Sequence, residues 1–196
     1  MKNKVLMGLA AFMMVALLAS CGKVPQVQVD AAKAAVESAK VAQADIYVPS
    51  EFAAVQDSLN AVNASIEAKS SKWFKNYKDE QAKLEGIVVT AGQVSANATT
   101  KKEQVKLEAE TLMTDVNTVI ADNKTLITKA PRGKEGKAVL DEITNELTVI
   151  EASVVEAKGM YDKGDFMMAL DKLKAAKANA DSINVELKDA IAKVSK

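Results

Sequence analysis

Apolar residues recur along most of this chain at alternating spacings of three and four, which is the period of an amphipathic helix. The clearest stripe predicts a helix that begins at Pro49 or Ser50, because proline is well tolerated in the first turn of a helix. Its apolar positions are Phe52, Val55, Leu59, Val62 and Ile66. No stretch shows the sustained period-two alternation of a half-buried strand. The pattern therefore predicts an all-α fold without a sheet.

The same periodicity predicts helices on both sides of this one. A narrow seam indicates a first helix over about 29–44, with a connection at 45–50; the seam consists of Val29, Ala32, Val36, Ala39, Gln43 and Ile46. A third helix is expected over 71–94, and its apolar face carries Trp73, Tyr77, Leu84, Ile87, Val88 and Ala91.

Breaks in the pattern mark the remaining helices. Residues 97–100 are polar or small, and Thr100 followed by Glu103 fits a capping box that would open a fourth helix. The Pro- and Gly-containing segment 131–136 is the clearest loop, and a fifth helix follows it with Val139, Ile143, Leu147, Ile150 and Val154 on its apolar face. Gly164 is suited to end that helix, and a sixth then reaches the C-terminus.

Two predicted hairpins resemble each other. Val55, Leu59, Val62 and Ile66 align with Ile143, Leu147, Ile150 and Val154; Tyr77, Leu84, Ile87 and Ala91 align with Phe166, Leu173, Ala176 and Ala180. Either the hairpins arose by duplication, or two amphipathic helices simply align when their phases agree. We expect an antiparallel bundle of five to six helices, consisting of the two hairpins and a linking helix, in a single domain over residues 29–196.

Composition narrows the range of functions. The chain has 26 basic and 26 acidic residues, so it lacks the basic surplus that nucleic-acid binding requires. It has no histidine, which excludes serine or cysteine hydrolysis through an imidazole base and leaves no indication of a metal or cofactor. Carboxylate chemistry stays open at three acidic pairs: Asp79-Glu80, Glu108-Glu110 and Asp141-Glu142.

The N-terminus carries the most specific signal in the chain. Lys2 and Lys4 precede an apolar run over 5–19 that is interrupted only by Gly8, and the segment ends at Leu18-Ala19-Ser20-Cys21. A charged start, a short apolar stretch and small residues before a cleavage point describe a secretory signal. If Cys21 is not a site of lipid attachment, the segment is either an ordinary signal peptide or an apolar helix that happens to contain a cysteine.

The last four residues of this segment resemble the processing box of bacterial lipoproteins. The resemblance implies that residues 1–20 are removed and that Cys21, the only cysteine, is linked to diacylglyceryl and acylated with chains such as palmitate. Residues 21–28 would then form a tether. Gly22 stands where aspartate would signal retention in the inner membrane, which favours the outer membrane, with the protein facing the periplasm.

Two weaker resemblances concern the mature chain. Residues 30–103, with the corner Tyr47-Val48-Pro49-Ser50-Glu51, resemble the envelope lipoproteins of domain-of-unknown-function family 4398, which implies no activity and no functional residues. The segment 161–170, with Gly164, Asp165 and Phe166, is similar to the corner of a tetratricopeptide repeat, although the full repeat pattern is absent.

One candidate interface combines basic and aromatic residues: Lys69, Lys72, Trp73, Phe74, Lys75, Tyr77 and Lys78. Such a mixture suits contact with a membrane surface or a glycan. The alternative is a helical corner in which the rings fill the end of the bundle while the lysines stay solvated. Met160, Met167 and Met168 likewise either line an adaptable groove or fill the core.

These observations favour a non-enzymatic lipoprotein of the bacterial envelope, held to the membrane by Cys21, with a structural or protein-binding role. A carrier of an apolar small ligand between helices is the competing interpretation, and a carboxylate hydrolase is a third. The expected partners are the membrane and an envelope protein.

Overall fold

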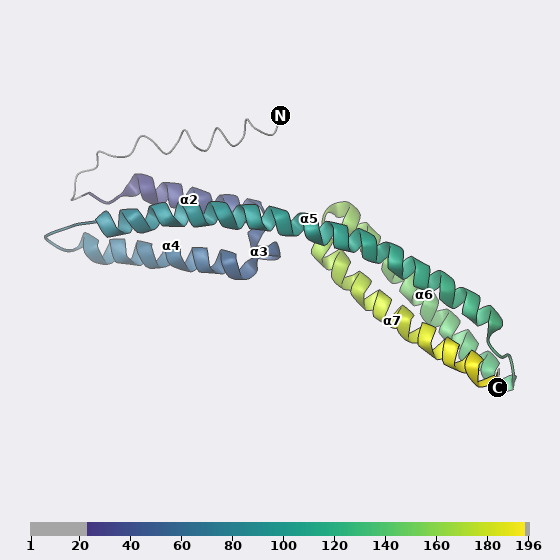
Figure 1. The fold of residues 1–196 in the computed structure, drawn as a ribbon. Helices are drawn as coiled ribbons and strands as arrows, with labels where there is room; N and C mark the ends of the chain where they lie inside the picture. Colours follow the sequence, from purple (N-terminus) through teal and green to yellow (C-terminus); the bar gives the residue numbers. More distant parts are fainter. Residues whose placement is uncertain (1–22, 195–196) are drawn as a thin grey trace, which may run out of the picture. The chain divides into compact units, whose positions relative to one another are not determined.

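The computed structural model describes residues 23–194, which contain six helices and no strand (Figure 1). This confirms the all-α fold and the expected number of helices. The leader and Cys21 lie outside the described residues. The described chain forms two compact units, divided between Thr100 and Lys101, each with its own buried apolar residues. That residues 29–196 form a single domain stays a prediction.

The first unit contains α2 (Gln26–Val41), α3 (Ala44–Tyr47), α4 (Pro49–Ser70) and the beginning of α5 (Lys78–Lys129). All five apolar residues predicted for α4 are buried. In α2 the first four seam residues are buried, but Gln43 adopts a left-handed conformation with φ of 62°. This turn shifts the helical phase. Ile46 is therefore 44% exposed, and Tyr47 packs into the core in its place.

The second unit contains the rest of α5, α6 (Lys134–Lys163) and α7 (Phe166–Val194). The expected corner at Gly164 is confirmed: φ is 89°, and the amides of Gly164 and Asp165 donate to the carbonyls of Tyr161 and Met160. These two bonds satisfy carbonyls that the end of α6 would otherwise leave open. The predicted stripe of α6 is buried from Ile143 onward, whereas Val139 is exposed.

The break expected at residues 97–100 is wrong, because α5 continues through it. Thr99 and Thr100 donate their hydroxyls to the carbonyls four residues earlier, at 3.0 and 3.1 Å, so they remain compatible with a helix. Ala98 is fully buried and carries the apolar stripe across the polar segment. Thr100 therefore caps no new helix.

The two hairpins that align in sequence also match in burial. Every aligned residue is buried except Phe166, which is half-buried. In the first unit the hairpin is α4 with the beginning of α5, and in the second it is α6 with α7. Their origin by duplication stays a prediction.

Candidate functional site

The residues between α4 and α5, 71–77, form a loop at one end of the first unit, which we call the tip loop (Figure 1). Trp73 is 92% exposed and Phe74 is 90% exposed. The prediction of a helix from Ser71 with Trp73 on its apolar face is therefore wrong, and neither Trp73 nor Phe74 fills the end of the bundle. Of the three rings in the predicted interface, only Tyr77 is buried.

Local hydrogen bonds explain why the chain leaves the helix here. Ser70 and Ser71 donate their hydroxyls to the carbonyls of Glu67 and Ala68, which ends α4 with side-chain bonds. At the other side of the loop, the side-chain oxygen of Asn76 accepts from the amide of Lys78 at 3.1 Å and starts α5. The loop is thus fixed at both ends, and its two exposed rings lie between these bonds.

A cluster of Ser65, Lys69 and Glu80 joins α4 to α5 directly behind the tip loop. The Lys69 ammonium lies 2.7 Å from the Glu80 carboxylate, and the Ser65 hydroxyl donates to the same carboxylate at 2.8 Å. Lys69 also donates to the carbonyl of Asn76 at 3.3 Å. Glu80 is only 2% exposed. Lys69 therefore holds the hairpin together and is not part of the free surface.

Electrostatics of this cluster favour the charged carboxylate. Burial acts to raise the pKa of Glu80, but the hydrogen bonds from Lys69 and Ser65, a backbone hydrogen bond and the positive charge of Lys69 together keep that pKa below its ordinary value. Glu80 is consequently an ionised structural group at neutral pH. A general acid at that pH would need the opposite shift.

The other lysines of the predicted interface are solvent-exposed. Lys72, Lys75 and Lys78 form no ion pair within the described part of the chain. No acidic residue occurs between Glu67 and Asp79. The structure thus brings five of the seven predicted residues together as an accessible basic and aromatic surface, while Lys69 and Tyr77 serve the packing behind it.

A groove of about 650 Å³ runs between α4 and α5 in the same unit. Its floor consists of the buried residues Val55, Val62, Ile87 and Val94. Small or polar residues line its sides, and they include Ala54, Ser58, Ala61, Gly86 and Thr90. Its volume lies within the usual range for small-ligand sites.

The three methionines near the corner at Gly164 do not all lie in the core. Met160 and Met167 are half-buried, and Met168 is 60% exposed. Tyr161 and Phe166 pack together at this corner with ring centroids 5.0 Å apart, and the Tyr161 hydroxyl donates to Glu110. Burial and this hydrogen bond raise the pKa of Tyr161 to about 12.

Three of the six carboxylates in the acidic pairs contact a residue of another helix. Glu80 belongs to the cluster described above, Glu110 accepts from Tyr161, and Glu108 lies 2.9 Å from Lys174. Within residues 23–194 no group of three or more acidic or cysteine side chains is placed to hold a metal ion. None of the described helices is long and apolar enough to span a membrane.

Sequence reasoning missed the most buried polar residue. Asn123 is fully buried; it donates to the carbonyl of Ala180 at 2.7 Å and accepts from the side chain of Asn184 at 2.7 Å. Its burial could have been predicted from its helical position, because Asn123 lies on the same face of α5 as the buried residues Val116 and Ile120.

Comparison with family models, with curated protein sequences and with solved structures finds no match to this chain. The resemblance to the family of unknown function stays a prediction.

Proposed function

We propose that this protein is a non-enzymatic lipoprotein of the bacterial cell envelope that is held to the membrane by acylated Cys21 and binds an envelope protein through its helices. The observation that carries this proposal is the segment Leu18-Ala19-Ser20-Cys21 after a charged and apolar leader. Acyl chains contribute about 0.8 kcal/mol for each buried methylene, so two or three chains give lasting attachment. The outer membrane, facing the periplasm, is the favoured location.

The described residues support a binding role over catalysis. Glu80, Glu108 and Glu110 connect helices, and Trp73 and Phe74 of the tip loop are exposed. Anchoring also raises the local concentration of the protein, so that a modest affinity for a neighbour in the envelope suffices.

The test of the anchor is Cys21→Ser in the native host. We expect the variant to leave the membrane fraction and to lose labelling by a fatty-acid analogue. Val27→Ser, at an exposed position of α2 outside the processing box, keeps the thiol and serves as the control. If Cys21→Ser fractionates and labels like the unmodified chain, the proposal is refuted.

The groove between α4 and α5 favours one second candidate, a carrier of an apolar small ligand. The residues that line it do not include Met160, Met167 or Met168, which the sequence offered as the lining of an adaptable groove. Native protein extracted with organic solvent should release a stoichiometric small molecule if it is a carrier. Cross-linking in intact cells should instead yield protein neighbours if it is a binding protein.

A further inference from the structure

We propose that the tip loop docks onto the anionic lipid surface of the same membrane that holds Cys21. The inference rests on the proposed lipid anchor and adds a second contact to it. In this contact Trp73 and Phe74 enter the headgroup region, while Lys72, Lys75 and Lys78 pair with lipid phosphates.

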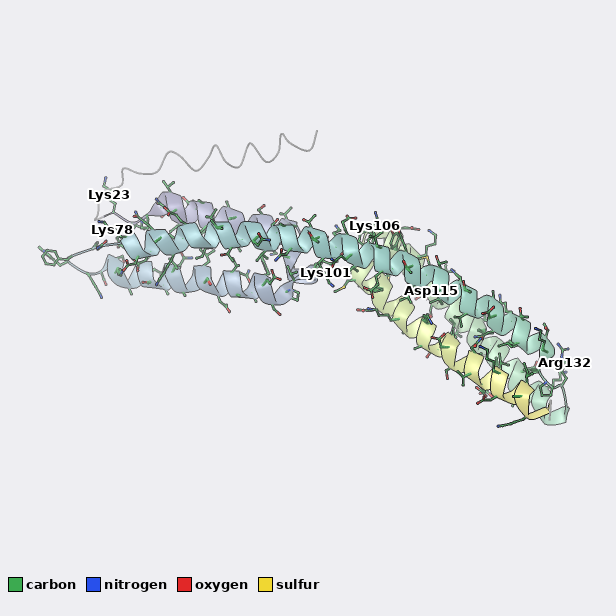
Figure 2. All side chains as sticks on the ribbon, in the orientation of Figure 1. Lys23, Lys78, Lys101, Lys106, Asp115 and Arg132 are labelled. Carbon is green, nitrogen blue, oxygen red and sulfur yellow. The ribbon has the colours of Figure 1, made fainter. Side chains whose placement is uncertain are left out.

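The first step is that the anchor and the tip loop belong to the same end of the first unit. α2 contacts α4, and the chain reverses direction between them, so the start of α2 lies at the end where α4 finishes. Figure 2 shows Lys23, which precedes α2, and Lys78, which follows the tip loop, at this end. The tip loop therefore points in the direction from which the anchored segment enters.

The second step is the length of the connection. α2 begins at Gln26, and Pro25 before it is already buried against the unit. Only Gly22, Lys23 and Val24 separate Cys21 from this packed residue. Four residue steps span at most about 14 Å, so an acylated Cys21 keeps this end of the unit close to the bilayer.

The third step is the chemistry of the loop. Indole and phenyl rings that are about nine-tenths exposed are unusual on a solvated surface, whereas aromatic rings are enriched at the depth of lipid headgroups. Residues 68–78 contain four lysines and no acidic residue, and Lys23 adds a further positive charge at the same end. Basic residues near a bilayer are attracted by anionic lipids. Both features are matched by one occupant, an anionic lipid surface.

The chain provides its own probe, because Trp73 is its only tryptophan. The full-length protein would be purified from membranes and reconstituted in vesicles of phosphatidylcholine brominated near the top of the acyl chains, with about one-third phosphatidylglycerol. We expect Trp73 to lose roughly half of its emission relative to vesicles without bromine, because the indole ring lies at headgroup depth. Mass spectrometry of the Cys21 peptide is recorded on the same sample.

Two variants test the residues that carry the contact. Phe74→Ser and the double variant Lys72→Glu/Lys75→Glu should each remove most of this quenching while the protein stays bound to vesicles. The matched control is Lys33→Glu/Lys40→Glu, which makes the same charge change at exposed positions of α2 and should quench like the parent chain. Equal losses in the control would show that net charge, not the tip loop, determines the effect.

The outcomes separate this inference from the lipid anchor. An acylated Cys21 with unquenched Trp73 overturns the docking of the loop and leaves the anchor intact. An unmodified Cys21 with quenched Trp73 refutes the anchor and retains the loop as a membrane contact. An unmodified Cys21 with unquenched Trp73 refutes both.

Discussion

At the scale of single residues, the two buried or half-buried tyrosines at the ends of the hairpins are in opposite situations. Tyr77 is 2% exposed, and its hydroxyl has no hydrogen-bond partner within the described residues. Tyr161 donates its hydroxyl to Glu110. A buried hydroxyl without a partner is a cost, whereas a bond to a charged acceptor stabilises the fold.

We therefore predict opposite effects for the same substitution. Tyr77→Phe should leave the free energy of unfolding unchanged or raise it by up to about 1 kcal/mol, and Tyr161→Phe should lower it by about 1–3 kcal/mol. Denaturant unfolding at pH 7 measures both. A loss of stability in Tyr77→Phe equal to that in Tyr161→Phe would contradict the assignment of the unpaired hydroxyl.

The pKa of Tyr161 adds a pH dependence. Because its pKa rises from 10.0 to about 12 in the folded chain, the unfolded chain ionises first as pH increases. The stabilisation by this hydroxyl is complete below pH 10 and is lost as pH rises through 12. The stability difference between the parent chain and Tyr161→Phe should narrow over that range. A difference that stays constant from pH 8 to pH 12 would show that the pKa is not raised.

Asn123 tests whether a buried amide joins α5 to α7. Asn123→Ala removes both of its hydrogen bonds and leaves a space, so we expect it to lower the free energy of unfolding by about 1–3 kcal/mol. Asn117→Ala is the matched control, since Asn117 is exposed on the same helix and gains the same helix propensity. The control should change stability by less than about 0.5 kcal/mol.

Glu80 and Asn123, whose burial was not predicted from the sequence, both occupy positions on the apolar face of α5. Glu80 lies in phase with Tyr77 and Leu84, and Asn123 lies in phase with Ile120. Phase alone predicts burial, but it does not say which partner on another helix will satisfy the group. Ser65 and Lys69 for Glu80, and Ala180 and Asn184 for Asn123, become neighbours only through tertiary packing.

At the scale of secondary-structure elements, the corner between α6 and α7 depends on one backbone conformation. Gly164 has φ of 89°, which is strained for a residue with a side chain. Gly164→Ala should therefore lower the free energy of unfolding by about 1 kcal/mol. Gly159→Ala, inside α6 with open space around it, should raise it by about 0.5–1 kcal/mol. Thermal unfolding of the two variants should shift in opposite directions.

The hairpin of α4 and α5 depends on the Glu80 cluster, which makes its stability sensitive to acid. The pKa of Glu80 is lowered in the folded chain, so the unfolded chain takes up the proton first as pH falls. Its stabilisation is present above the ordinary pKa near 4.5 and is lost as pH falls through the lowered value.

Glu80→Gln isolates this effect. At pH 7 we expect the variant to be less stable by about 1–3 kcal/mol, because Lys69 and Ser65 lose a charged acceptor. The difference from the parent chain should shrink as pH falls below about 4.5. Glu85→Gln, at an exposed position of the same helix, should show no such convergence. If the difference in the free energy of unfolding between the parent chain and Glu80→Gln grows as pH falls, the pKa of Glu80 is not lowered in the folded chain.

The predicted helix boundaries were correct only where a single residue type restricts the backbone. The start of α4 at Pro49 and the corner at Gly164 were predicted correctly, because proline and glycine restrict the backbone locally. Residues 97–100 contain neither, and their hydroxyls bond within the helix, so their polarity was misread as a break. Trp73 was placed on the apolar face of a helix because of its hydrophobicity, and only the structure shows Trp73 and Phe74 in an exposed loop.

At the scale of the whole molecule, each unit has a fully buried leucine in its own core: Leu84 in the first and Leu173 in the second. Replacing either with alanine removes apolar contacts and leaves a cavity, at a cost of about 2–5 kcal/mol. The consequence for the rest of the chain depends on whether residues 29–196 unfold as a single domain, as the sequence suggests, or as two.

Because the buried residues of each unit form a separate core, we predict that the losses are local. In native-state hydrogen exchange, Leu84→Ala should reduce protection mainly in α2 and α4, and Leu173→Ala mainly in α6 and α7. Each variant serves as the control for the other, since the same side chain is truncated at the same burial. If either substitution lowers protection equally in both units, the two cores unfold together and residues 29–196 behave as one cooperative domain.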